Sequence, residues 1–240
     1  MKEKIQPFLM VLLVGAAFAI GSMWTQLRMM KDGKSDQIKQ TEEQGQVAGE
    51  EEEEILELSD EQWQKLLNSP AAVKGEEGAK VIMAELTDYQ CPFCKRYVDE
   101  TLVQIDRDYI QTGKVKYLFL DLPLGFHQSA QLTAEAARCA GDQEKYWEMH
   151  DLLFDKQAEW SAGEAEGLIK KYAISLGLNS DDFNSCLETG KYTQAVKDNL
   201  SLAEEVKANG TPSFFINGQK IVGAQPYATF KAMIDQALGE

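Results

Sequence analysis

The chain has 240 residues, enough for one large or two small domains, and its apolar (44%) and charged (26%) fractions are those of a folded protein. Eighteen Gly, six Pro and four Cys exclude collagen-like chains and disulfide-dense small proteins. The net charge of −15 repels phosphate groups, so we expect no nucleic-acid partner. Residues 36–61 hold eleven acidic side chains and one lysine, so most of this charge lies in one short segment.

Residues 1–27 are predicted to be a membrane anchor or a signal segment. No charged residue occurs over 5–26, and as a helix this stretch would span about 33 Å, enough to cross a hydrocarbon core of about 30 Å. Lys2 and Lys4 precede it, as in a signal peptide. Residues 17–19 (AFA) have the form of a cleavage site, but the apolar run continues beyond them. An uncleaved anchor in the lipid bilayer is therefore favoured over a cleaved signal peptide, and a buried soluble helix is the third alternative.

Both favoured alternatives place the rest of the chain outside the cytoplasm, in a periplasm or at the outer face of the cell membrane. Residues 28–57 are predicted to form a flexible acidic linker, because 32–56 lack aromatic residues and Glu50–Glu54 are five like charges in a row. A solvated spacer is the favoured interpretation of this run, and a metal- or partner-binding tail is the alternative. The folded domain is then expected over 58–240.

Apolar periodicity in this domain predicts the order βαβ, a helical block, and ββα. A short helix capped by Ser59 begins it. Strands are expected at 80–86, 115–120, 213–216 and 219–222, and single helices at 92–110 and 226–238. Asn217-Gly218 predicts a tight hairpin between the last two strands. After residue 124 the pattern is helical for about 85 residues, with breaks near Gly141, 161–163, 178–179 and Gly190.

The motif Cys91-Pro92-Phe93-Cys94 directly follows a predicted strand and opens a helix. The unpaired N–H groups and the dipole of a helix N-terminus stabilise a thiolate, and proline is well tolerated in the first turn. Cys91 is expected to be the more exposed, nucleophilic cysteine, and Cys94 to resolve the mixed disulfide. A redox-active pair is therefore predicted.

Two other interpretations of this motif are half of a zinc site and an inert structural bridge. Zinc would need further ligands, and the candidates are scattered singly along the chain: His127, Cys139, His150 and Cys186. We expect His127 to be a packing or capping residue and His150 to be a core residue. For Cys139 and Cys186 a structural disulfide is favoured outside the cytoplasm, with two free thiols or a second redox relay as alternatives.

Two features elsewhere in the sequence bear on the same site. Glu85 precedes Cys91 on an otherwise apolar strand, where its pKa would be raised and it could exchange a proton with Cys94. The alternative is a glutamate that faces solvent. Thr211-Pro212 stands just before the predicted strand at 213, a position compatible with a cis peptide bond, although trans is the general expectation.

Three segments together resemble the DsbA-like thiol:disulfide oxidoreductases of the thioredoxin superfamily. They are VIMAELTDYQCPFC (81–94), AARCAGDQEKYWEMHDLLF (136–154) and GTPSFFING (210–218), within a resemblance that covers 58–239. The resemblance implies an α/β thioredoxin fold with an inserted helical domain at about 126–208. It also implies that Pro212 is cis and faces Cys91, that Thr211 docks the substrate backbone, and that Glu85 is the buried acid. No organic cofactor or metal is implied.

The function implied by the resemblance is an extracytoplasmic enzyme that introduces disulfides into unfolded exported proteins. A quinone-linked membrane partner would reoxidise its cysteine pair. Strongly oxidising members of the family often carry His where this chain has Phe93, so we expect a less oxidising pair here. The alternatives are an isomerase or reductase, which in this family often dimerises through a separate N-terminal domain, and a tethered holdase or assembly factor without redox activity.

Overall fold

The computed structural model describes residues 57–240. The predicted membrane segment (1–27) and the predicted linker up to residue 56 lie outside this range, so both stay predictions. Within the described residues no helix is sufficiently long and apolar to span a bilayer.

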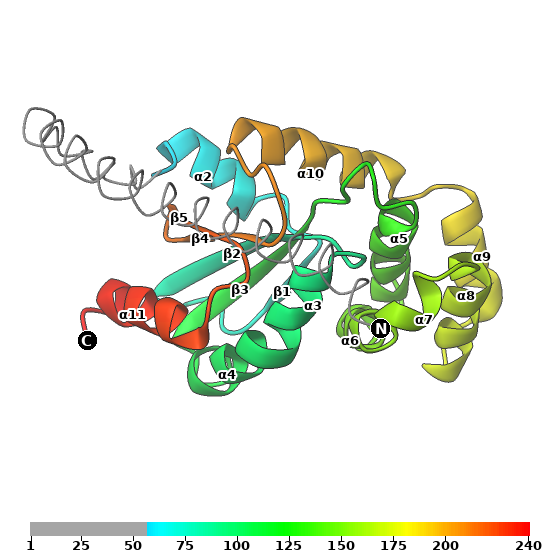
Figure 1. Ribbon diagram of the computed structural model, residues 1–240, viewed down its shortest axis with the longest axis horizontal. Coiled ribbons are helices and arrows are strands. Elements are labelled where there is room, and N and C mark those ends of the chain that lie inside the picture. Colours follow the sequence, from blue (N-terminus) through cyan, green and yellow to red (C-terminus); the bar gives the residue numbers. More distant parts are fainter. Residues whose placement is uncertain (1–56) are drawn as a thin grey trace, which may run out of the picture. The chain divides into compact units, whose positions relative to one another are not determined.

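Residues 57–240 contain a five-stranded sheet in the order β1-β3-β2-β4-β5 (Figure 1). The central strands β2 (Val81–Thr87) and β3 (Val115–Asp121) are parallel and buried almost throughout, as expected for strands covered on both faces. β4 (Ser213–Ile216) and β5 (Gln219–Val222) form the predicted hairpin, in which β4 pairs antiparallel with β2. At the other edge of the sheet, β1 (Ala72–Lys74) pairs antiparallel with β3. This strand was not predicted, because three residues are too few to show a periodicity.

The helices follow the predicted pattern. Their bounds are α2 (Asp60–Leu67), α3 (Pro92–Tyr97), α4 (Val103–Ile105), α5 (Ala130–Gly141), α6 (Tyr146–Asp155), α7 (Gln157–Trp160), α8 (Ala165–Ser175), α9 (Ser180–Glu188), α10 (Thr193–Glu205) and α11 (Tyr227–Leu238). The helix expected over 92–110 is continuous but includes two π-helical stretches, η1 (Val98–Leu102) and η2 (Asp106–Ile110). Ser59 caps α2 in a reciprocal capping box with Gln62. All four predicted breaks in the helical block separate observed helices.

The sheet lies between two layers of helices. Helices α3, α4 and α11 lie on one side of the sheet, and α2 and α10 on the other (Figure 1). Alternate residues of β2 face opposite layers, so Met83 belongs to the first core and Ala84 to the second. Helices α5–α9, here called the helical cluster, gather at one end of the sheet (Figure 1). The Met83 core continues without interruption into this cluster. The last helix of the block, α10, packs on the sheet itself, through Leu202 and Ala203 and through its C-cap residue Val206.

Two sets of contacts hold the helical block in place. Cys139 of α5 and Cys186 of α9 form a disulfide with Cα atoms 5.9 Å apart, so of the three alternatives for this pair the structure has the bonded one. Closing a loop of 47 residues restricts the unfolded chain and stabilises the fold by about 4 kcal/mol. Near β3, the largely buried side chain of Arg138 donates to Asp121 Oδ2 at 2.6 Å and to Asn199 Oδ1 at 2.9 Å. This network joins β3, α5 and α10.

Candidate active site

The two cysteines of the motif lie where β2 gives way to α3. Cys91 is the N-cap of α3, and its carbonyl oxygen accepts the first helical hydrogen bond from Lys95 N at 3.2 Å. Pro92 occupies the first turn and Phe93 is 55% exposed, whereas Cys94 lies one turn in and is fully buried. Both thiols are free. Cys91 is also largely buried, at 4% exposed, so the predicted difference in exposure between the two cysteines is small.

The two thiols differ strongly in acidity. A hydrogen bond from the Cys94 thiol lowers the pKa of Cys91 to about 6, against the opposing effect of burial, and the N–H groups of Cys94 and Phe93 add to the lowering. Burial raises the pKa of Cys94, and the neighbouring Cys91 raises it further. At neutral pH the Cys91 sulfur is therefore a thiolate, and Cys94 is a protonated thiol. This arrangement suits Cys91 for nucleophilic attack.

Glu85 is completely buried beneath the cysteines. It shares the face of β2 with Met83, and Tyr117 of β3 donates a hydrogen bond to its Oε2. Burial raises the pKa of Glu85 to about 8, and the charge on Cys91 contributes to the rise. The solvent-facing alternative for Glu85 is therefore wrong.

The segment before β4 lies against Cys91. Because β4 pairs antiparallel with β2, it brings residues 211–212 to the end of β2 from which α3 begins. The Thr211–Pro212 peptide bond is cis, as the resemblance implied. Sγ of Cys91 lies 3.5 Å from the carbonyl oxygen of Thr211, to which its protonated form donates, so this backbone is next to the sulfur that would react.

The family of this chain is shown by its similarity to known proteins. A family model described as thioredoxin matches residues 67–236. The chain belongs to this thioredoxin family. Among solved structures, the thiol-disulfide exchange protein alpha-DsbA2 from Wolbachia pipientis superposes with a TM-score of 0.62 at 26% identity, over 73% of this chain and 92% of that one. The resemblance to DsbA-like proteins is thus confirmed at the level of the fold.

Two curated relatives illustrate the range of proteins that this thioredoxin domain resembles. Disulfide bond formation protein D of Bacillus subtilis is 26% identical over 173 residues, which are 69% of this chain and 76% of that protein. The Na(+)/H(+) antiporter NhaA 1 of Salinispora arenicola is 32% identical over 166 residues, which are 69% of this chain. The chain spans only about a quarter (24%) of the length of that antiporter.

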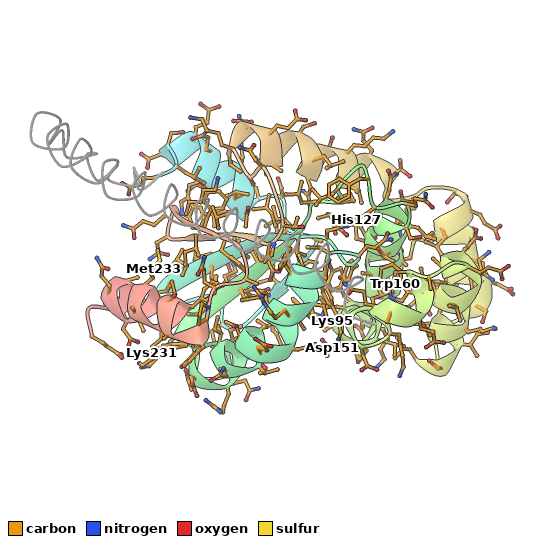
Figure 2. The ribbon with its side chains drawn as sticks, in the orientation of Figure 1. Lys95, His127, Asp151, Trp160, Lys231 and Met233 are labelled. Atoms are coloured by element: carbon orange, nitrogen blue, oxygen red, sulfur yellow. A yellow bond between two sulfur atoms is a disulfide. The ribbon has the colours of Figure 1, made fainter. Side chains whose placement is uncertain are left out.

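The turn before Cys91 is held by Asp88, a residue that was not predicted to belong to the site. The buried Asp88 accepts a hydrogen bond from Gln90 N at 2.7 Å through Oδ1. Its Oδ2 accepts from Leu124 N and meets His127 Nδ1, each at 2.8 Å. His127 follows β3, where the chain turns toward the helical cluster (Figure 2). Asp88 could have been found from the sequence, because it is a polar residue placed directly between a buried strand and the motif.

The structure also bears on the zinc interpretation. Cys139 and Cys186 are bonded to each other, and His127 is bound to Asp88. His150 is buried among the rings of Phe119, Trp147 and Phe154, as expected for a core residue. Within residues 57–240 no three His, Cys, Asp or Glu side chains are grouped so that they could hold a metal ion.

Proposed function

We propose that this chain is a thiol:disulfide oxidoreductase that works through a Cys91–Cys94 dithiol/disulfide couple. The observation that carries the proposal is the opposite shift of the two pKa values within one helical turn, with Thr211 O at 3.5 Å from the Cys91 sulfur. A low-pKa thiol both attacks and leaves readily as thiolate. The names of the Wolbachia and Bacillus proteins, thiol-disulfide exchange protein and disulfide bond formation protein, support the same chemistry.

In the oxidising direction, a substrate thiolate attacks Sγ of Cys91 in the Cys91–Cys94 disulfide. The Cys91–Cys94 bond breaks, and the sulfur of Cys94 takes up the electron pair together with a proton from the buried carboxyl of Glu85. A second thiolate of the same substrate then attacks the substrate sulfur of the mixed disulfide, and Cys91 leaves as a thiolate. The substrate is oxidised by two electrons and the enzyme is left as the dithiol. Backbone beside Thr211 and Pro212 would hold the substrate segment.

We propose net disulfide formation in exported, unfolded proteins outside the cytoplasm as the physiological direction. A quinone-linked membrane partner would reoxidise the dithiol, and the 1–27 segment would keep the domain at the bilayer. No organic cofactor or metal takes part in this scheme. The Cys91 pKa of about 6 is nearer to the value of about 7 in thioredoxin than to about 3.5 in DsbA. We therefore expect a less oxidising couple than that of DsbA.

The reduction potential of the full-length chain, equilibrated with glutathione buffers, tests this proposal. A potential between the values of DsbA, about −120 mV, and protein disulfide isomerase, about −180 mV, supports net oxidation. A potential of about −270 mV, as in thioredoxin, favours the reductase alternative. A Cys139→Ala/Cys186→Ala variant assigns the signal to the motif.

Oxidation of reduced, unfolded ribonuclease measures turnover directly. Replacing Cys91 and Cys94 by Ser abolishes that turnover if the pair is redox-active. A holdase would instead continue to protect the ribonuclease from aggregation after the same replacement. A wild-type chain that fails to equilibrate with glutathione would overturn the proposal and leave the structural bridge as the function of the pair.

A further inference from the structure

A glutamine from the helical cluster reaches into the turn that carries Cys91. Gln157 is the first residue of α7, and its side chain is largely buried, at 8% exposed. Its amide Nε2 donates to the carbonyl oxygen of Tyr89 at 2.7 Å and to that of Cys91 at 3.0 Å. One amide group therefore bridges the residues on either side of Gln90.

We propose that Gln157 is a positioning residue that holds Cys91 in its reactive geometry. This inference rests on the proposed function and extends it, because it assigns part of the control of the Cys91 thiol to the helical cluster. Gln157 does not touch the sulfur, so it acts through the backbone of Cys91.

The position of Gln157 is itself firmly held. Trp160, at the other end of α7, is completely buried, and its indole N–H donates to the carbonyl oxygen of Leu153 at 2.7 Å (Figure 2). This contact joins α7 to α6 in the core shared with the cysteines. A buried glutamine side chain loses its conformational freedom, and its amide must be hydrogen-bonded. Both donor hydrogens are used on the turn before α3.

The bond to the Cys91 carbonyl oxygen acts on the Cys91–Pro92 peptide group, which flanks the Cys91 side chain, and the bond to the Tyr89 carbonyl oxygen fixes the turn that precedes it. The carbonyl oxygen of Cys91 already accepts from Lys95 N, so Gln157 is its second donor and ties the start of α3 to the helical cluster. On the other side of the turn, Asp88 O accepts from Cys91 N at 3.1 Å. Without Gln157 the turn keeps its bonds to Asp88 and the bond from Ser129 N to Gln90 Oε1 at 2.9 Å, but the carbonyl oxygen of Cys91 loses its tie to α7. The Cys91 sulfur could then rotate away from the N–H groups of Phe93 and Cys94 that lower its pKa.

Gln157→Met removes both donors and retains most of the side-chain volume. Because the Cys91 sulfur is then held less firmly against the N–H groups that stabilise its thiolate, we expect the midpoint of the Cys91 titration to rise by about half a pH unit. We expect the rate of mixed-disulfide formation with oxidised glutathione at pH 6 to fall about twofold, since the thiolate fraction falls from about one half to about one quarter. Thiolate absorbance at 240 nm in the reduced full-length chain gives the titration.

Gln143→Met is the matched control. Gln143 belongs to the same helical block and also bonds backbone, with Nε2 donating to Asn179 O at 3.3 Å and Oε1 accepting from Asn179 N at 2.7 Å. Both bonds lie within the helical block and neither involves the turn before α3, so its variant should titrate and react like the wild type. A purely structural contribution of Gln157 would lower the unfolding temperature without moving the titration.

Unchanged titration and exchange rates in Gln157→Met would overturn the inference, as would equal shifts in Gln143→Met. If Gln157→Met does not fold, Gln157→Asn replaces it, because the amide is kept but is one methylene too short to reach both carbonyls. A wild-type titration in Gln157→Asn would also overturn the inference. A wild-type chain that does not exchange with glutathione defeats the proposed function instead, and the titration alone still tests the positioning.

Discussion

Glu85→Gln tests the buried acid, because it removes the ionisable group and keeps the shape of the side chain. The pKa of Glu85 rises from 4.5 to about 8 on burial. A carboxyl whose pKa is raised in the folded state binds its proton more tightly there than in the unfolded chain. Its effect on stability is therefore absent below pH 4.5 and becomes increasingly unfavourable as the pH rises toward 8.

The size of the effect follows from the interval between the two pKa values. Each pH unit above the unfolded pKa costs about 1.4 kcal/mol, so keeping Glu85 protonated at pH 7 costs about 3 kcal/mol of folding free energy. Glutamine carries no such cost. We expect Glu85→Gln to match the wild type near pH 4 and to exceed its stability by about 3 kcal/mol near pH 7.

Urea unfolding of both proteins at a series of pH values measures this difference. Glu100→Gln is the control, since Glu100 is exposed in η1 and its replacement should leave the curve unchanged at every pH. A stability difference between Glu85→Gln and the wild type that is independent of pH would refute the reasoning, because it would show that Glu85 does not titrate differently in the folded state. Turnover should move in the opposite direction and fall about 100-fold, the lower range of general acid catalysis.

Three further predictions concern the cysteine pair and the helical block. Cys94→Ala should raise the midpoint of the Cys91 thiolate titration from about 6, because the Cys94 thiol is the largest cause of the lowering; absorbance at 240 nm measures it, and an unchanged midpoint would assign the lowering to the helix N-terminus alone. Phe93→His should make the reduction potential in glutathione buffers more oxidising, since a charged imidazole stabilises the reduced, thiolate form. A shift toward the thioredoxin value of about −270 mV would contradict this. Arg138→Met should lower the free energy of unfolding by about 3–5 kcal/mol, because Asp121 would be left buried without its partner at 2.6 Å. Urea unfolding measures this loss, and a value below about 1 kcal/mol would show that the pair is not desolvated.

The elements that could be predicted from sequence are those with a local signal. The Asn217-Gly218 turn and the alternation around it located β4 and β5 to the residue. β1 has three residues and is defined by its pairing with β3, a distant contact that no local sequence pattern predicts. The π-helical stretches η1 and η2 retain helical periodicity, so the sequence predicts one ordinary helix there. The domain bounds and the membrane segment stay predictions.

The residues of the candidate active site also differ in whether a local sequence signal identifies them. Cys91 and Cys94 are close together in sequence, and Glu85 could be located because one acidic residue interrupts an apolar strand. The hydrogen bonds of Tyr117 to Glu85 and of Gln157 to Cys91 exist only because the sheet and the helical cluster bring distant residues together. A tyrosine in a strand and a glutamine in a helix carry no signal of such partners. Sequence therefore located the residues proposed to react, but not the residues that hold them.

The opposite acidities of the two cysteines and the burial of Glu85 follow from one arrangement. Cys91 caps α3 and meets N–H groups, whereas Cys94, one turn further, is enclosed between the helix and the sheet and faces the carboxyl of Glu85. Opening the disulfide would expel a thiolate at Cys94, where burial makes a charge unfavourable. A carboxyl with a pKa of about 8 is protonated at neutral pH and can neutralise that thiolate as it forms. The burial that destabilises the fold at pH 7 is thus the condition for Glu85 to act as an acid, so a more stable Glu85→Gln protein should also be a slower one.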